Sequence, residues 1–271
     1  MGVVLNGNNV FFGRAEVGMS IVEDGLILYM DPNNARSYSG TGTQVNNVAP
    51  ATTNNGVTGS LDDAAMYVNP SDSAAYFRVR SDSVVQRLEF SDTLSLPGSG
   101  SHTLMFYFWS DYNGNGQYGN SQAFLGGKYT NYMALVSPTS TSTTYSAEAE
   151  TNGSGTPQGN HDYFALPVSE SAVFTTGSWN SWTTIINDLT GSNYFNGSLG
   201  SGRLVDGANE YHLLSSTSTF SFTRLGSNST GTGGGSRGGD IRMGALLLYN
   251  RVLTQEEITR NLLILDRRFN T

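Results

Sequence analysis

Residues 240–263 read Asp240-Ile-Arg-Met-Gly-Ala-Leu-Leu-Leu-Tyr-Asn-Arg-Val-Leu-Thr-Gln-Glu-Glu-Ile-Thr-Arg-Asn-Leu-Leu, and this stretch decides the fold. Its first part is apolar on both faces of a period-two pattern, so it predicts a strand that is covered on both sides. One face consists of Ile241, Met243, Ala245, Leu247 and Tyr249, and the other of Leu246 and Leu248.

The period changes after residues 250–251, where a helix is expected to begin. Thr254 and Glu257 have the spacing of a capping box, and Leu253 and Ile258 have that of a hydrophobic staple. One helical face then continues through Leu262, Leu265 and Phe269. No other part of the sequence predicts a helix as clearly.

Working outward, strand patterns separated by Gly, Asn and Ser turns recur along the chain and favour an all-β sandwich. Residues 104–109 are the most apolar of these runs and predict a central strand. Asn196-Gly197 predicts a tight hairpin turn, because this pair tolerates positive φ. Residues 39–59 predict a surface loop, and residues 137–160 an insertion or a long loop.

Four segments in the same order resemble one family. Residues 244–258 closely resemble the closing segment of laminin-G-like, concanavalin A-like jelly-roll domains. Residues 25–38, Gly-Leu-Ile-Leu-Tyr-Met-Asp-Pro-Asn-Asn-Ala-Arg-Ser-Tyr, resemble the opening strand of the version found in virion proteins of tailed bacteriophages. Residues 182–187 with 194–197, and residues 223–227, are similar to the strands between these two. The resemblance covers roughly residues 21–266.

The resemblance implies a two-sheet antiparallel jelly-roll sandwich over residues 21–271, closed by one short C-terminal helix. Residues 1–20 precede it as an arm or as an extra strand. The fold does not fix an activity, because it hosts lectins, glycanases, adhesion modules and structural domains.

Composition narrows the classes of function. The chain has 271 residues and a net charge of −8, and Lys128 is its single lysine. Such a chain is a poor candidate for binding nucleic acids or anionic membranes. It has no cysteine, which excludes thiolate metal sites and disulfides. We expect no membrane span and no secretory signal, since no long apolar run and no basic leader is present.

The N-terminal segment is too apolar for a solvated tail. One interpretation is an extra strand on the sandwich. The other is an arm that docks on a neighbouring subunit, where assembly would bury its side chains. The assembly contacts would be Val3, Leu5, Val10, Phe11 and Phe12.

Residues 111–116 copy the first half of a calcium-binding EF-hand loop. Asp111, Asn113 and Asn115 supply oxygen side chains at positions one, three and five, and glycine stands at six. Position twelve, where the loop needs a bidentate glutamate, is Gln122. Calcium is therefore an alternative to an ordinary Asn/Gly loop, and we expect no other cofactor.

The same region is rich in aromatic residues, which stack on sugar rings in lectin pockets. Tyr112 and Tyr118 are the candidates for contact with a glycan, together with Asp240 beside the glycine-rich loop of residues 231–239. Trp109 and Tyr132 belong to strand patterns and are predicted to be core.

Enzymatic chemistry has little support in the sequence. A glycanase needs two opposed carboxylates, and the resembling glucanases carry them as Glu-x-Asp-x-x-Glu. Glu148 and Glu150 are the nearest match but lack the central aspartate and the third acid. His102, His161 and His212 are isolated from one another in the chain. We therefore expect no enzyme.

The resemblance implies a non-enzymatic virion structural protein, a capsid decoration or short head-fibre protein made in the host cytoplasm and displayed on the outer surface. Its partners would be capsid or tail subunits, in an oligomer or symmetric array. The alternative is a glycan-binding adhesin that recognises host surface polysaccharide.

Overall fold

The computed structural model describes residues 4–6, 9–11, 20–71, 73–81, 85–110, 121–126, 132–136, 145–150, 163–168, 177–188, 190–199, 219–226 and 241–270. Within these residues the chain forms two large antiparallel sheets and one α-helix, α1 (Gln255–Phe269). The predicted all-β sandwich with a C-terminal helix is confirmed.

The first sheet contains nine strands among the described residues. In spatial order they are β17 (Ser198–Leu199), β16 (Thr190–Phe195), β15 (Ser178–Asn187), β10 (Ser101–Ser110), β19 (Ile241–Tyr249), β7 (Tyr76–Ser81) and β6 (Tyr67–Val68). In addition, β3 (Leu26–Met30) pairs with β19, and β8 (Val85–Gln86) pairs with β7. The apolar strand β10 is central, as its composition predicts.

The second sheet contains eight strands among the described residues. Their order is β14 (Tyr163–Val168), β13 (Tyr145–Glu150), β12 (Tyr132–Val136), β11 (Ser121–Gly126), β18 (Thr219–Leu225), β9 (Leu88–Pro97), β5 (Gly59–Leu61) and β4 (Gln44–Val45). A short 3₁₀ helix, η1 (Ala64–Met66), precedes β6. A separate two-stranded hairpin consists of β1 (Val4–Asn6) and β2 (Asn9–Phe11).

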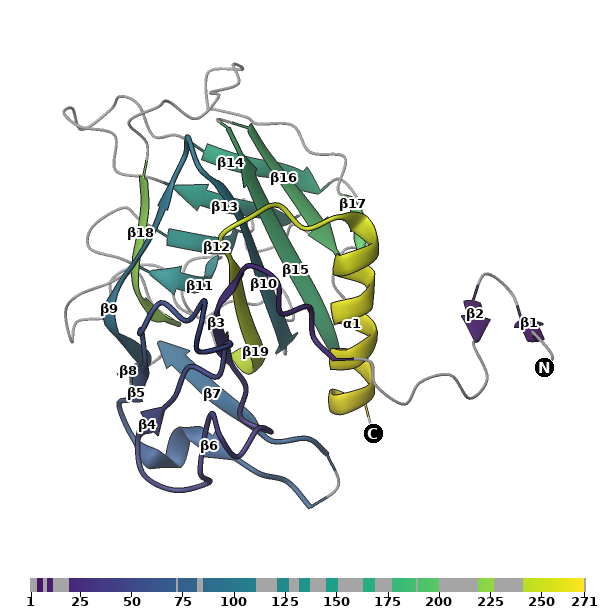
Figure 1. Cartoon of the computed structure of the whole chain (residues 1–271). Coiled ribbons are helices and arrows are strands. Elements are labelled where there is room, and N and C mark those ends of the chain that lie inside the picture. Colours follow the sequence, from purple (N-terminus) through teal and green to yellow (C-terminus); the bar gives the residue numbers. More distant parts are fainter. Residues whose placement is uncertain are drawn as a thin grey trace.

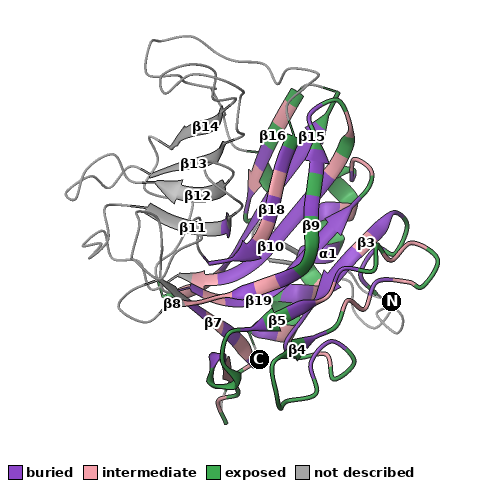
Figure 2. Cartoon of the chain, turned by 90° about the vertical axis from the view of Figure 1, so that its left-hand side faces the viewer, coloured by how far each residue is buried: buried purple, intermediate pink, exposed green. Residues whose placement is uncertain are grey.

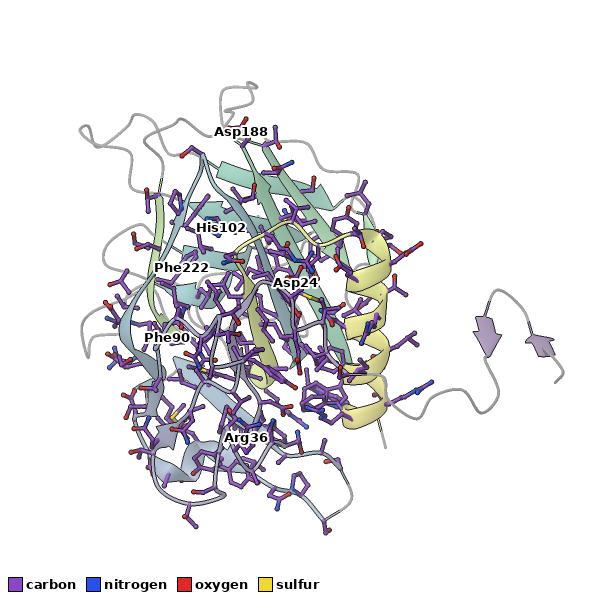
Figure 3. The ribbon with its side chains drawn as sticks, in the orientation of Figure 1. Asp24, Arg36, Phe90, His102, Asp188 and Phe222 are labelled. Atoms are coloured by element: carbon purple, nitrogen blue, oxygen red, sulfur yellow. The ribbon has the colours of Figure 1, made fainter. Side chains whose placement is uncertain are left out.

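The main core lies between the two sheets. On β10 the side chains of Leu104, Phe106 and Phe108 point into it, and from the facing sheet come side chains such as Phe90 and Phe222 (labelled in Figure 3). Figure 2 shows the buried residues running along β10, β15 and β19. Alternate residues of these same strands therefore face away from the second sheet.

Helix α1 covers much of that outward face. Figure 1 shows it lying along the nine-stranded sheet, with its C-terminal end toward the end of the sheet where β10 finishes. Its apolar side chains pack on the outward residues of β10, β15 and β19, which makes a second core. The helix contributes Ile258, Leu262, Leu265 and Phe269, and the sheet contributes Met105, Tyr107, Ile185, Ala245, Leu247 and Tyr249. The expectation that the final strand is covered on both faces is confirmed.

The helix start is fixed as the sequence predicts. The Thr254 hydroxyl accepts a hydrogen bond from the Glu257 amide at 3.2 Å, and the Glu257 carboxylate accepts one from the Thr254 amide at 2.9 Å. Arg251 adds an ion pair to Glu257 with an N–O distance of 2.6 Å. The pKa of Glu257 is lowered to about 2, chiefly by its hydrogen bond from Arg251.

Several local predictions need correction. Within residues 137–160, residues 145–150 form strand β13, which pairs with β12 and β14 instead of being a loop. Residues 39–59 contain the short strand β4, which pairs with β5.

The Asn196-Gly197 turn is confirmed, with φ of 47° and 80°. No helix among the described residues is long and apolar enough to cross a membrane.

Candidate functional site

Beyond the C-terminal end of α1, the outward face of the nine-stranded sheet carries a row of large side chains. Trp179, Trp109, Arg242 and Arg78 are successive register partners on β15, β10, β19 and β7. Directly opposed residues of an antiparallel pair project on the same side of the sheet. All four are half-buried, so each retains some contact with solvent. We call them, together with Tyr76, the aromatic–arginine row.

Four side chains of the row, those of Trp179, Trp109, Arg242 and Tyr76, contact one another. The Trp109 and Trp179 rings meet edge to face, with centroids 5.9 Å apart. The Arg242 guanidinium carbon lies 5.1 Å from the centroid of the Trp109 ring and 5.4 Å from that of Tyr76. Both distances are those of cation–π contacts. With strands about 4.8 Å apart, the row extends about 14 Å across the sheet.

The last turn of α1 and a glycine hold one end of the row. Trp179 stacks on the buried Tyr107 at 5.6 Å and contacts Phe269 at 4.7 Å between centroids. A Cβ atom at Gly244 would lie 2.9 Å from both the Trp179 and the Phe269 ring. Any side chain at position 244 would therefore collide with these two rings, which pack against the backbone of β19 at this glycine.

Polar contacts hold the last turn of the helix in this position. The Tyr107 hydroxyl donates to the Asp266 carboxylate and accepts a hydrogen bond from the side-chain amide of Asn270 at 3.2 Å. Burial, and then Asp266, raise the pKa of Tyr107, so its hydroxyl keeps its proton. Arg268 forms an ion pair with the buried Asp31. The row thus abuts a fixed helix end.

The other end of the row is held by the loop after β3. The Asn33 side chain donates to the Ala75 carbonyl at 2.7 Å and accepts from the Ala75 amide at 2.8 Å. The Asn33 amide itself donates to the Asp31 carboxylate at 2.8 Å. These bonds fix the start of β7 and so place the backbone of Tyr76. Asp31 therefore contacts residues at both ends of the row, Arg268 of α1 at one end and Asn33 at the other.

Most site residues predicted from the sequence lie outside the described residues. These are Asp111, Asn113 and Asn115 of the calcium hypothesis, Tyr112, Tyr118 and Asp240 of the glycan hypothesis, and Val3 and Phe12 of the assembly hypothesis. Leu5, Val10 and Phe11 are described only in their backbone, which pairs Leu5 with Val10 and Val4 with Phe11.

Two of the predicted segments are continuous with strands that carry the row. Ser110 is the register partner of Ile241 and of Ser178. Residue 111 follows Ser110 and residue 240 precedes Ile241. Both predicted segments therefore join the sheet at the ends of β10 and β19 that are next to the row.

The prediction that Trp109 is core is wrong. Alternation along β10 places it on the outward face, past the part that α1 covers, and it is half-buried. Sequence reasoning also missed Trp179, Arg242 and Tyr76. A single strand does not show that these residues lie together, because the row forms only through the pairing of β15, β10, β19 and β7. The sequence signal that could have found Trp179 is its period-two spacing with Ser181 and Thr183.

The acidic and histidine residues considered in the sequence can be placed only in part. The described His, Asp and Glu side chains do not gather in threes as a metal site would require. His102 lies between Asp188 and Arg36 in Figure 3, and burial lowers its pKa, which favours the neutral imidazole. Glu148 and Glu150 belong to β13, in the sheet that does not carry the row.

The chain matches no family model, and it matches no curated protein. Solved structures are similar to it in fold. The binding domain of Paraclostridial Mosquitocidal Protein 1 has a TM-score of 0.54 and 14% identity, with 90% of this chain and 52% of that chain covered. Domain 4 of AbnA, a GH43 extracellular arabinanase from Geobacillus stearothermophilus in complex with arabinotriose, has a TM-score of 0.52 and 16% identity.

That arabinanase domain is covered over 100% of its length by 89% of this chain. Trypanosoma rangeli sialidase in complex with sialic acid has a TM-score of 0.50 and 14% identity, with 91% of this chain covered. The chain spans 34% of the length of that sialidase. At these identities the similarity is one of fold, and the chain therefore shares its β-sandwich architecture with domains of binding proteins and of glycan-active enzymes.

Proposed function

We propose that this chain is a non-enzymatic carbohydrate-binding module and that the aromatic–arginine row is its glycan contact surface. The single observation that carries the proposal is the row itself, four opposed and half-buried side chains on adjacent strands. Half-buried aromatic rings offer flat apolar faces, on which the C–H faces of sugar rings stack. Arginine donors complement sugar hydroxyls.

The shape of the surface favours a glycan chain over a single sugar. The row runs across the strands for about 14 Å, long enough for several sugar rings in line. Its members are held by the core and by the last turn of α1, so little side-chain order has to be gained on binding. The similar fold of an arabinanase domain solved with arabinotriose agrees with this use of a sandwich.

The phage setting stays a prediction of the family resemblance in residues 25–38. Display on a virion and recognition of a host polysaccharide are compatible, because an adhesin on a particle needs both. No contact among the described residues favours a capsid role over other settings, so we propose glycan binding without a location.

The proposal is tested on a glycan array, followed by titration calorimetry with the glycans that bind. We expect Trp109→Ala and Trp179→Ala each to weaken binding at least about tenfold, since a buried tryptophan contact is a typical hot spot. Tyr194→Ala is the matched control. Tyr194 is also a half-buried aromatic of this sheet, but it packs against the core under α1 and not in the row.

Two results would count against the proposal. One is equal glycan binding by the wild type and Trp109→Ala. The other is a change of oligomeric state in Trp109→Ala with no glycan bound by either protein, which would make the row a protein interface. Light scattering on the same samples separates these outcomes.

A further inference from the structure

Trp179 is the member of the row that the protein itself packs on several sides. Its indole stacks on the Tyr107 ring, with centroids 5.6 Å apart and planes 13° from parallel. The Phe269 ring lies 4.7 Å from it at an angle of 51°, and the Trp109 ring lies 5.9 Å from it at 80°. A Cβ atom at Gly244 would lie 2.9 Å from it, so the backbone of β19 contacts it as well. Three rings and one backbone segment therefore hold this indole.

These contacts fix the orientation of the indole. Tyr107 is 1% exposed and Phe269 is 2% exposed, so neither ring has room to move away. Tyr107 belongs to β10, whereas Phe269 is the last residue of α1. A ring with neighbours on several sides has little face left on which a sugar could stack. The position of Trp179 therefore matters to the row through the neighbour that it touches.

That neighbour is Trp109. In an edge-to-face pair the electropositive edge of one ring points at the electronegative face of the other, so the contact is directional. A change in the orientation of Trp179 therefore changes the favoured orientation of Trp109. Arg242 contacts the Trp109 ring from β19, with its guanidinium carbon 5.1 Å from the ring centroid. An arginine side chain has many rotamers and constrains a ring less than a packed indole does.

From these contacts we infer that Trp179 is a positioning residue, through which the last turn of α1 sets the orientation of Trp109 for the glycan. The inference rests on the proposed glycan-binding function and adds how the site is controlled. Affinity then depends on Phe269, a buried side chain that packs beneath the row and is too little exposed to offer a sugar a surface.

The first test needs no ligand. The chain has three tryptophans, so labelled indole N–H groups give three signals in a nuclear magnetic resonance spectrum. Trp182 is the internal reference, because it is 1% exposed in the main core and its indole N–H donates to Asn193 at 2.9 Å. We expect Phe269→Leu to shift the Trp179 and Trp109 signals and to leave the Trp182 signal in place.

The second test measures affinity by calorimetry, with arabinotriose and with the tightest-binding glycan of the array as probes. Phe269→Leu should weaken binding about tenfold, because the row loses part of its preorganisation. Trp179→Leu should weaken it about tenfold or more for the same reason. Trp179→Phe keeps an aromatic ring beside Trp109 and should restore affinity to within about threefold of the wild type, with a Trp109 signal close to its original position.

Ile258→Ala is the matched control. Like Phe269→Leu, it shortens a buried apolar side chain of α1 in the second core. Ile258 lies near the other end of the helix, about 16 Å from Phe269 along the axis. We expect affinity within about twofold of the wild type and unshifted Trp109 and Trp179 signals, because distant sites act independently.

The outcomes separate this inference from the proposed function. An unshifted Trp109 signal in both Phe269→Leu and Trp179→Leu would mean that other contacts hold Trp109, which overturns the positioning role but leaves glycan binding by the row intact. Equal weakening by Ile258→Ala also overturns it, because the effect would then follow stability. If the wild type binds no glycan, the proposed function fails, and the ligand-free signals still decide whether the helix end positions Trp109.

Discussion

The outward face of the nine-stranded sheet has two parts that the same strands build differently. Under α1, β10 and β19 present Met105, Leu247 and Tyr249 to the helix, and all three are buried. Past the helix end, the same two strands present Trp109 and Arg242, which are half-buried. The change occurs at Gly244, where the last helical side chain, Phe269, meets Trp179.

The two parts differ in the kinds of side chain that they present, and this difference distinguishes a face that packs under a helix from a face that can contact a ligand. Aliphatic side chains stabilise a face only when apolar groups cover them, as the helix does here. Tryptophan, tyrosine and arginine tolerate partial hydration and are enriched where proteins contact ligands. The part of the face under α1 therefore contributes to stability, and the part that no described element covers is the candidate for binding. The four predictions below test this division.

The largest effect is expected from an arginine at the covered end. Arg268→Met leaves Asp31, which is 0% exposed, without its ion-pair partner. Removing one partner of a buried pair costs about 3 kcal/mol, the lower end of the range, because the Arg268 side chain is itself 33% exposed. Chemical denaturation measures this loss of unfolding free energy. A loss below about 1 kcal/mol would mean that the hydrogen bonds from the Tyr29 hydroxyl and the Asn33 backbone amide satisfy Asp31 without Arg268.

A smaller loss is expected at the buried amide of the helix. Asn261 accepts a hydrogen bond from the Val22 amide and donates one to the Tyr249 hydroxyl, both at 2.9 Å. Asn261→Ala leaves buried polar groups without a partner, which costs about 1–3 kcal/mol. Hydrogen exchange should show the Val22 amide losing protection together with this change. Thr259→Ala, at an exposed position of the same helix, is the control.

Much of this covered region can be predicted from residues 240–263 alone. The apolar pattern predicts β19, the spacing of Thr254 and Glu257 predicts the helix start, and both are confirmed. The predicted faces of β19 are wrong in part, because Ile241 and Met243 lie in the main core and not on the face of Ala245. Such signals are local, since a cap and a periodicity are each set within about one helical turn or one strand. Residues 145–150 were harder, because the apolar face of their alternation has only one large residue, Tyr145, and their strand depends on pairing with β12 and β14.

The candidate site is another matter, because its parts come from four strands that are far apart in sequence. Trp109 and Trp179 are 70 positions apart and meet only through the register of β10 and β15. Register is set by packing and by turns, and a single residue of slip moves a side chain to the other face. Such a shift occurs between β10 and β19, where the consecutive residues Tyr107 and Phe108 pair with Ala245 and Met243 and Gly244 of β19 is skipped. The sequence therefore predicts the aromatic content of this region but not which rings share a face.

The charge at the helix start should make the covered region sensitive to acid. The pKa of Glu257 is about 2 in the folded protein against 4.5 for the unperturbed group. Because the folded pKa is lowered, the stabilisation is present above about pH 4.5 and is lost as the pH falls toward 2. The Arg251–Glu257 pair is partly exposed, so its contribution is about 1 kcal/mol.

Glu257→Gln isolates this charge, because glutamine can also close a capping box. We expect the variant to be about 1 kcal/mol less stable than the wild type at pH 7 and equally stable near pH 2. Urea denaturation across this pH range measures the difference. A constant difference at all pH values would assign the effect to the cap geometry and not to the charge.

The smallest effect on stability is expected at the uncovered end, where Arg242→Met repeats the substitution proposed for Arg268. Here the arginine contacts the Tyr76 and Trp109 rings and is itself half-buried, so its loss removes cation–π contacts of about 0.5–1 kcal/mol. Methionine keeps apolar contact with both rings and offsets part of that loss. Denaturation of the two Arg→Met variants side by side gives the contrast directly. If Arg242→Met costs as much as Arg268→Met, then the row supports the fold in the same way as the covered region, and its residues are no longer evidence of a binding surface.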